Sequence, residues 1–202
     1  ADSLAGKADC KTDLEQVLGF EPSKEPILGV VTRLTVQKGV DLIAGILPAL
    51  VGIGARVVIL GTGETEIENQ LTALGNRYPD NFKAILRFDA VLAQKIYAGS
   101  DLFLMPSRFE PCGLGQMIAM RYGTLPIVNR TGGLKDTVAD GKTGFVFAPL
   151  TADEFLRTIN RAIKTRQDPT KWQTLQKTAM SQDFSWGKSA ERYAEIYKQL
   201  VI

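Results

Sequence analysis

The sequence predicts an α/β fold, a Rossmann-like, doubly wound parallel sheet of about six strands. Short apolar runs rich in β-branched residues recur along the chain, and segments of helix length with apolar residues every three to four positions separate them. Strands that alternate with helices in this way form repeated βαβ units and therefore run parallel. Ligands of such sheets bind at the carboxyl ends of the strands.

The expected elements follow one another in a regular order. The first 20 residues are expected to form a helix that leads through a turn at 21–24 into the first strand. Helical spacing of apolar residues is clearest in the segments 42–50 and 67–74. The predicted strands cover Ile27–Leu34, Ala55–Leu60, Phe82–Arg87, Leu102–Met105, Leu125–Asn129 and Gly144–Phe147.

Three helices are expected after the last predicted strand. The segments Thr151–Arg166 and Pro169–Gln182 are typical of surface helices, and Ser185 is placed to cap a final helix through Ile202. We therefore predict a Rossmann-like domain over residues 1–184 and a C-terminal helix over residues 185–202. One apolar stripe of that helix comprises Tyr193, Ile196, Tyr197 and Leu200.

Composition limits the classes of function. The chain has 202 residues, 45% hydrophobic and 23% charged, which suits one or two globular domains. Its 24 basic and 22 acidic side chains leave a net charge of +2, which gives no case for a nucleic-acid or membrane surface. No stretch approaches the roughly 20 apolar residues of a membrane span. A soluble chain is expected, and its start without Met suggests a fragment or a processed protein.

The chain contains no histidine and two cysteines. The absence of histidine excludes Ser–His and Cys–His nucleophilic pairs and imidazole metal sites, so any chemistry must use Lys, Arg, Asp, Glu and backbone groups. Cys10 and Cys112 lie in no CxxC or Cys/His ligand pattern. We expect them to be buried or partly buried free thiols rather than a disulfide.

Two cations lie at the end of the first predicted strand. Arg33 is near its carboxyl end, Lys38 follows it, and Gly39 opens the next helix. Cations that converge beside a helix N-terminus would neutralise a diphosphate and stabilise a departing leaving group. The alternative is that both are solvated loop charges.

Glycines follow the second and fifth predicted strands. Gly61 and Gly63 could let backbone amides contact a phosphate or a nucleoside, although a tight βα turn explains a single G-x-G pattern equally well. Thr131 and Gly132 follow the fifth strand and offer further N–H groups for an anion. Turn formation alone would also account for these residues.

The loop after the fourth predicted strand, Ser107–Gly115, is the most informative stretch of the chain. It combines an arginine and a carboxylate, Arg108 and Glu110, with glycines at the start of a helix. Glu110 would hydrogen-bond sugar hydroxyls or stabilise a cationic sugar transition state. The alternatives are a helix N-terminal acid for Glu110 and a salt bridge that fixes the loop for Arg108. Cys112 is expected to pack the loop, since no histidine is present to activate it.

Four segments together resemble the bacterial glycogen synthase and plant starch synthase family. The resemblance runs in order over nearly the whole chain. Members of this family are retaining glycosyltransferases with two Rossmann-like domains, the GT-B fold, and this chain is similar to the C-terminal, nucleotide-sugar-binding domain. The resemblance implies transfer of glucose from ADP-glucose to the non-reducing end of an α-1,4-glucan, without a metal or another cofactor. The four segments are Thr32–Gly39, Pro106–Leu114, Arg121–Pro126 and Thr131–Thr137.

The resemblance also implies residue roles. Arg33 and Lys38 match the pair that binds the donor diphosphate, and Glu110 matches the acid of the donor-glucose site, so these three are the expected catalytic residues. Phe88 falls at an aromatic position against adenine. The full set of expected donor-binding residues, including the glycines after the second strand, is Gly61, Gly63, Phe88, Cys112, Gly113, Leu114, Gly115, Thr131 and Gly132.

The chain departs from the family at several points. Ile118 stands where related retaining families carry a second glutamate, which glycogen and starch synthases commonly lack. Gly115 stands where relatives often have a hydroxyl residue, which leaves its phosphate contact to the backbone. The N-terminal domain of the family, with much of the acceptor surface, is missing, and the C-terminal helix is expected to pack on it. We therefore expect the isolated chain to bind nucleotide weakly and to be inactive.

Two other interpretations stay open. One is a stand-alone nucleotide-binding or interaction module whose last helix mediates self-association. The other is a different GT-B retaining glycosyltransferase or a nucleotide-sugar epimerase, because one architecture hosts many activities. Both ADP-glucose and UDP-glucose fit the expected base contact, and both glycogen and starch fit as acceptors. The expected location is the bacterial cytoplasm or the plastid stroma.

Overall fold

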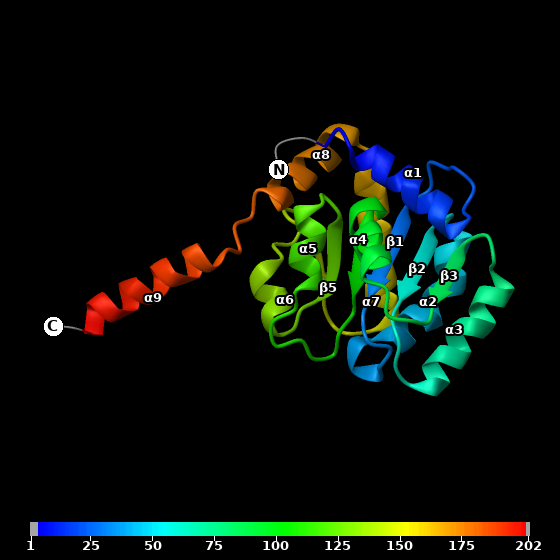
Figure 1. Ribbon diagram of the computed structural model, residues 1–202, viewed down its shortest axis with the longest axis horizontal. Helices are drawn as coiled ribbons and strands as arrows, with labels where there is room; N and C mark the ends of the chain where they lie inside the picture. Colours follow the sequence, from blue (N-terminus) through cyan, green and yellow to red (C-terminus); the bar gives the residue numbers. More distant parts are fainter. Residues whose placement is uncertain (1–3, 201–202) are drawn as a thin grey trace.

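A six-stranded, all-parallel sheet forms the centre of the computed structural model, which describes residues 4–200 (Figure 1). The strand order is β3-β2-β1-β4-β5-β6, so the direction of winding reverses between β1 and β4. In open α/β sheets this reversal creates a crevice at the carboxyl ends of the two central strands. The strands are β1 Ile27–Val31, β2 Arg56–Leu60, β3 Phe82–Ile85, β4 Leu102–Met105, β5 Leu125–Asn129 and β6 Phe145–Phe147.

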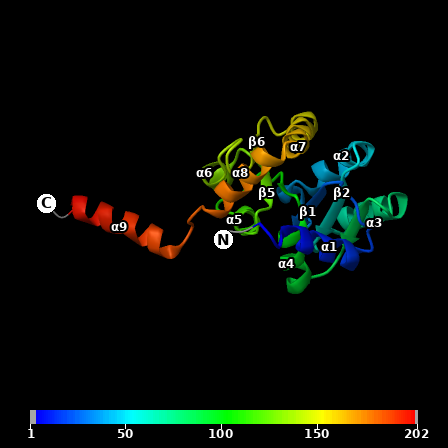
Figure 2. The same ribbon diagram turned by 90° about the horizontal axis from the view of Figure 1, so that it is seen from above.

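Helices cover both faces of the sheet, as expected for a doubly wound fold (Figure 2). One face carries α1, α4 and α5, and the other carries α2, α3 and α7. The helices are α1 Lys7–Leu18, α2 Val40–Gly52, α3 Thr65–Arg77, α4 Ala90–Gly99, α5 Gly115–Arg121, α6 Gly132–Thr137, α7 Ala152–Arg166, α8 Pro169–Met180 and α9 Trp186–Leu200, with a 3-10 turn at Val36–Lys38.

Burial on both faces explains why the strands are continuous apolar runs. Along β2, Val57 and Ile59 enter the core beneath α2 and α3, whereas Val58 and Leu60 enter the core beneath α1 and α4. Side chains of a strand alternate between its two faces, so a strand covered on both sides needs apolar residues at every position. The predicted fold class is therefore confirmed.

The first strand is shorter than the sequence predicts. We expected it to continue to Leu34, but β1 ends at Val31. Residues 32–34 lie beyond the end of β1 and contact the end of β2 and the loop that follows it. Thr32 N–H donates to Leu60 O at 3.1 Å, and Leu34 N–H donates to Thr62 O at 2.9 Å. The apolar character of Leu34 reflects burial beneath this loop rather than strand structure.

Side chains cap the starts of α7 and α9, and of these caps Ser185 was the expected one. Thr151 Oγ1 accepts from Glu154 N–H at the start of α7, and Ser185 Oγ accepts from Lys188 N–H at the start of α9. The helix α8 begins at Pro169 as predicted and ends at Met180, two residues before the expected end. The expected end of the last helix, Ile202, lies outside the described residues.

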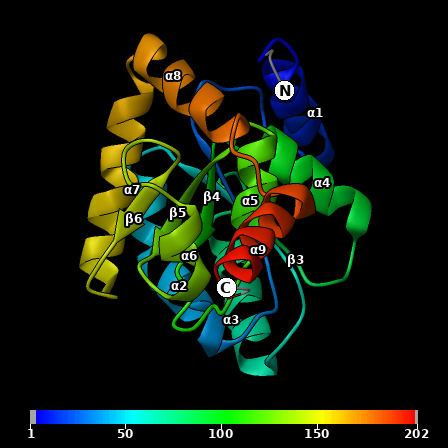
Figure 3. The ribbon, with the colours of Figure 1, turned by 90° about the vertical axis from the view of Figure 1, so that its left-hand side faces the viewer.

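The last helix, α9, extends away from the rest of the molecule in Figures 1 and 2, so that in Figure 3 it points toward the viewer. It buries none of its residues against the domain. Its predicted apolar stripe is exposed throughout, with Tyr193 61% and Leu200 74% accessible. That this helix packs on a further domain stays a prediction. Among residues 4–200 no helix has both the length and the apolar character that crossing a membrane requires.

A buried carboxylate joins four elements at the amino edge of the sheet. Asp101 directly precedes β4 and accepts from Ile27 N–H at 2.9 Å, from Lys11 Nζ at 2.8 Å and from Arg166 Nε at 2.9 Å. Burial alone would raise the pKa of Asp101. The charges of Lys11 and Arg166, with the hydrogen bonds from Lys11 and from Ile27 N–H, outweigh this effect and hold that pKa below its usual value.

We expect Asp101→Asn to lower the free energy of unfolding at pH 7 by about 3 kcal/mol, because it leaves two partly buried cations without their counter-charge. The pKa of Asp101 is lower in the folded state than its ordinary value of 3.8. Its contribution is therefore present above pH 3.8 and is lost as the pH falls through the folded-state pKa.

Urea unfolding at pH 7 and at acid pH measures this contribution. The gap between the wild type and Asp101→Asn should close at acid pH, whereas Asp80→Asn, at an exposed turn, should behave as wild type at both. Equal stability of the wild type and Asp101→Asn at pH 7 would contradict the assignment.

Candidate functional site

Three loops meet where the winding of the sheet reverses. They are the loop after β1 (residues 32–39), the loop after β4 (106–114) and the turn after β5 (130–133), all at the lower edge of the molecule in Figure 1. Parallel strands place their carboxyl ends at the same edge, so residues about 70 to 100 positions apart in the chain become neighbours here. This edge contains the residues that the sequence analysis selected after β1, β4 and β5.

An ion pair bridges the loops after β1 and β4. Lys38 Nζ donates to Glu110 Oε2 at 2.6 Å, and Ser107 Oγ donates to the same oxygen at 3.2 Å. The side chains of Lys38 and Glu110 are 16% and 9% exposed, so the pair is largely shielded from solvent. Two of the three expected catalytic residues are therefore in direct contact. Within residues 4–200, Glu110 Oε1 has no hydrogen-bond partner and can accept from a ligand.

Arg108 fixes the same two loops from the solvent side. Its guanidinium donates to both carboxylate oxygens of Asp41, at 2.8 and 2.7 Å, and to Val36 O at 2.6 Å. Its backbone N–H donates to Gln37 O at 2.9 Å. The hydrogen bonds to Asp41 raise the pKa of Arg108 above its usual value. This geometry matches the alternative considered for Arg108, a salt bridge that holds the loop.

The turn after β5 supports the Glu110 loop through its backbone. Gly133 N–H donates to Glu110 O at 3.0 Å, and Thr131 Oγ1 donates to Arg108 O at 3.4 Å. Gly132 has φ +41°, and a Cβ at this position would lie 1.9 Å from Glu110 O. Only glycine permits this approach, so the glycines of this turn have a structural reason independent of any ligand.

Two buried amide side chains that the sequence analysis did not select hold the loops from below. Asn129 Nδ2, at the end of β5, donates to Ser107 O at 2.8 Å. Gln116 Nε2 donates to Gly113 O at 2.9 Å and to Thr137 Oγ1 at 3.0 Å, which ties the start of α5 to α6. The sequence signal that could have selected Asn129 is its place as a polar residue at the last position of an otherwise apolar strand.

The segment 112–115 leads from the ion pair into α5. Gly113 adopts φ +75° and Leu114 is 65% exposed. Gly115 begins α5 so close to the core that a Cβ there would lie 3.0 Å from the Phe103 ring. Cys112 is exposed, which corrects the expectation of a buried or partly buried thiol, because it is the backbone of Cys112 that packs closely against Gly133. Both cysteines are free, as predicted.

The glycines after β2 are committed to packing. A Cβ on Gly61 would lie 1.8 Å from Thr32 O, and a Cβ on Gly63 would lie 2.1 Å from Leu34 O. Gly61 N–H already donates to Ile85 O at 3.1 Å, and Gly63 N–H donates to Glu68 Oε1 at 2.8 Å. The geometry favours the turn explanation for both, and their contact with a donor stays a prediction.

A cavity of about 250 Å³ lies beside these glycines. Arg33 and Phe88 line it from opposite loops, and Phe88 is 90% exposed. Arg33 is exposed and makes no ion pair with any other residue between 4 and 200. The cavity thus combines an unpaired cation with an open aromatic face. The other lining residues are Val31, Thr32, Leu60, Gly61, Thr62, Arg87, Asp89 and Ala93.

No group of three or more Cys, Asp or Glu side chains within residues 4–200 is arranged to hold a metal ion. The charged groups at this edge include the shielded Lys38–Glu110 pair, the exposed Arg108–Asp41 pair and the unpaired Arg33. Such an edge suits an anionic ligand with hydroxyl groups.

Comparison with known proteins gives this edge a context. A family model described as glycosyl transferases group 1 matches residues 13–178. The chain belongs to this family. The predicted resemblance is thereby confirmed at the level of the family, and the matched range contains all three loops of the site.

The similar curated proteins are bacterial glycogen synthases. The chain is 48% identical over 200 residues to the glycogen synthase of Exiguobacterium sibiricum, covering 96% of this chain and 41% of that protein. It is 46% identical over 209 residues to the glycogen synthase of Bacillus cereus strain ATCC 10987, covering 100% of this chain and 44% of that protein. The chain therefore spans less than half the length of these relatives.

A solved structure is similar over the same range. It is the catalytic domain of starch synthase IV from Arabidopsis thaliana bound to ADP and acarbose. It is 39% identical to this chain with a TM-score of 0.90, and the match covers 98% of this chain and 43% of the other. The likeness confirms the Rossmann-like fold of the group 1 glycosyl transferase domain.

We expect Gly132→Ala to destabilise the domain far more than Gly141→Ala. Both glycines have positive φ, but a Cβ on Gly132 would meet Glu110 O at 1.9 Å, whereas nothing lies within 4 Å of a Cβ on Gly141. Gly141→Ala should cost about 1 kcal/mol of backbone strain. Gly132→Ala should cost about 3 kcal/mol, because overpacking is added to that strain. Urea unfolding compares the two, and equal losses would show that the Glu110 loop does not depend on this approach.

Proposed function

We propose that this chain is the donor-binding half of a retaining glucosyltransferase that transfers glucose from ADP-glucose to the non-reducing end of an α-1,4-glucan. The identity to glycogen synthases and the similarity to an ADP-bound starch synthase domain support this proposal. The observation that carries it is the Lys38–Glu110 pair at the reversal point of the sheet. This pair places a fixed cation and a carboxylate with one unbonded oxygen at the edge where such sheets bind ligands.

Lys38 and Arg33 supply the charge that the leaving group needs. When the bond between the glucose C1 and the diphosphate breaks, negative charge accumulates on the departing ADP. Preorganised cations stabilise such charge without reorganising during the reaction. Lys38 is held in place by Glu110, which also accepts from Ser107, whereas the exposed Arg33 is free to bind the diphosphate from the solvent side. We propose that these two residues make a metal ion unnecessary.

Glu110 orients the sugar. Its Oε2 is committed to Lys38 and Ser107, so Oε1 is left to accept hydrogen bonds from glucose hydroxyls. The backbone amides at the start of α5, in the segment Gly113–Gly115, have no partners in the preceding turn and suit the phosphate oxygens. Thr131 and Gly132 lie against the Glu110 loop and complete the donor side of this edge.

The base of the nucleotide stacks on Phe88. An exposed aromatic ring beside a cavity of about 250 Å³ offers a flat apolar face to adenine. Arg33 lines the same cavity as Phe88. In the proposed complex, Arg33 therefore lies close to both the base and the diphosphate.

The other half of the enzyme is expected to supply the acceptor surface. Because the chain spans less than half of its glycogen synthase relatives, we propose that an N-terminal domain closes over the donor and that α9 packs on it through its exposed stripe. Closure of two domains would exclude water and align the acceptor. The isolated chain then binds nucleotide weakly and turns over little. The proposed location is the bacterial cytoplasm or the plastid stroma.

We expect Arg33→Ala and Lys38→Ala each to weaken ADP binding by roughly tenfold, since a charge-assisted hydrogen bond contributes about 1.5 kcal/mol. Isothermal titration of the chain with ADP and UDP measures the effect, and ADP should bind more tightly than UDP. Arg157→Ala, a solvent-exposed arginine on α7, is the matched control and should bind as wild type. Unchanged ADP binding in both site variants would contradict the proposed role of this edge.

We expect Phe88→Ala to weaken the binding of ADP by about tenfold and to leave the binding of pyrophosphate unchanged, because only ADP carries a base to stack. Thermal unfolding should not change, since the ring is 90% exposed. Trp186→Ala removes an equally exposed aromatic ring on α9 and serves as the control. An equal loss for both ligands would place Phe88 at the phosphates rather than at the base.

A further inference from the structure

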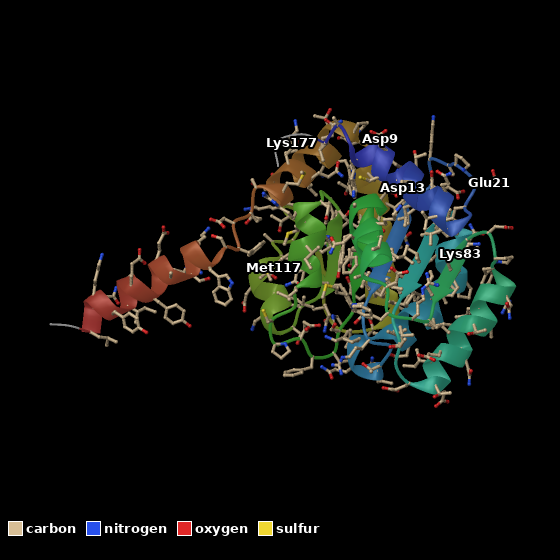
Figure 4. All side chains as sticks on the ribbon, viewed as in Figure 1. Asp9, Asp13, Glu21, Lys83, Met117 and Lys177 are labelled. Atoms are coloured by element: carbon tan, nitrogen blue, oxygen red, sulfur yellow. The ribbon has the colours of Figure 1, made fainter. Side chains whose placement is uncertain are left out.

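A second cavity lies at the amino edge of the sheet, opposite the candidate site. It has a volume of about 570 Å³ and lies between α1, α8 and the end of α7. In Figure 4, Asp9 and Lys177 project from α1 and α8 at this upper end of the molecule. The ionisable residues that line the cavity are Lys7, Lys11, Lys24, Arg166, Glu15 and Asp101.

The two carboxylates of this cavity are already neutralised. Glu15 pairs with the buried Arg56. Asp101 pairs with Lys11 at 2.8 Å and with Arg166 at 2.9 Å. The lining therefore holds two cations, Lys7 and Lys24, that form no ion pair within residues 4–200.

Lys7 is the unusual member of this lining. Its Nζ donates to Ala98 O at 2.6 Å and to Thr124 Oγ1, and both acceptors are neutral. Within residues 4–200 it forms no ion pair. An ammonium group held in a wall without a counter-ion is costly, because burial removes its hydration without replacing it by opposite charge.

The titration behaviour agrees with this shortage of negative charge. The pKa of Lys7 is lowered to about 8, mainly by burial; the neighbouring Asp101 and Cys10 oppose this shift and Lys11 adds to it. Burial also lowers the pKa of Lys11 in spite of its pair with Asp101. An anion in the cavity would supply the missing charge and raise both values.

We propose that this cavity binds a small phosphate-bearing metabolite, with Lys7 and Lys24 supplying the uncompensated charge. Lys24 is exposed at the rim and is free to reach an incoming anion. The volume exceeds that of a phosphate group, and the remaining wall offers hydroxyl and amide groups that suit the hydroxyls of an organic phosphate. Those polar residues are Thr12, Ser23, Gln173 and Gln176.

Trp172, which also lines the cavity, reports binding directly. The chain has two tryptophans, so Trp186→Phe on the exposed α9 leaves Trp172 as the sole fluorophore. We expect inorganic phosphate and a hexose monophosphate each to change its emission with saturation, and the hexose phosphate to bind more tightly if the polar wall contacts the sugar. The signal should persist in Arg33→Ala, which disables the proposed donor site, so the two sites are distinguishable.

Lys7→Met should weaken this binding by at least about tenfold, the effect of removing a charged partner. Lys142→Met, in an exposed turn before β6, is the matched control and should bind as wild type. If Lys7→Met does not fold by circular dichroism, Lys24→Gln at the exposed rim takes its place and should weaken binding by roughly threefold. No saturable response to either ligand, or equal affinity in the folded lysine variants, would overturn the proposal.

Proton uptake gives a second readout. At pH 8 about half of the Lys7 side chains are neutral, so an anion that raises the pKa should draw protons onto Lys7 as it binds. Calorimetric titration in two buffers of different ionisation enthalpy measures this uptake. At pH 8 it should be present in the wild type and absent in Lys7→Met, whereas binding to the wild type without proton uptake at pH 8 would place the anion elsewhere.

Discussion

The ion pair between Lys38 and Glu110 is the contact on which the candidate site depends. It joins the two halves of the sheet between β1 and β4, where the direction of winding reverses. Both side chains are largely shielded from water. Either charge alone would be costly in this position, because removal of one partner leaves the other desolvated and unpaired. The pairing therefore requires the loops after β1 and β4 to stay together.

Other contacts at this edge keep the loops after β1 and β4 in place. Arg108 clamps them from the solvent side through Asp41, and Asn129 holds Ser107 from the core. The turn at Gly132 approaches the backbone of Glu110 so closely that no side chain fits between them. Since Lys38 and Glu110 are positioned before a ligand arrives, the proposed reaction would need little reorganisation of this pair when negative charge develops on the leaving group.

The fold was predictable because the pattern of burial is simple. Strands covered on both faces must be apolar throughout, and β4 Leu102–Met105 and β5 Leu125–Asn129 have the bounds that the sequence predicts. The end of β1 was not predictable, because Leu34 is buried by a loop contact rather than by the sheet. The strand order also lies beyond local patterns, since it depends on packing between distant segments.

The site was only partly predictable for the same reason. The sequence analysis selected Arg33, Lys38, Glu110 and Gly132 because charged residues and glycines at the carboxyl ends of parallel strands are typical of ligand sites. The pairing of Lys38 with Glu110 joins positions 72 residues apart, and no local spacing indicates it. The prediction that Cys112 is a buried or partly buried thiol was wrong. Its exposure depends on the path of the loop after β4, which packs against the turn after β5.

The measurement that tests the central claim most directly is the crystal structure of this chain with ADP bound. The account predicts that the diphosphate lies between Arg33, Lys38 and the start of α5, with adenine against Phe88 and the Lys38–Glu110 pair intact. A diphosphate bound away from the carboxyl ends of β1 and β4, or a Glu110 loop that leaves Lys38 when ADP binds, would contradict it.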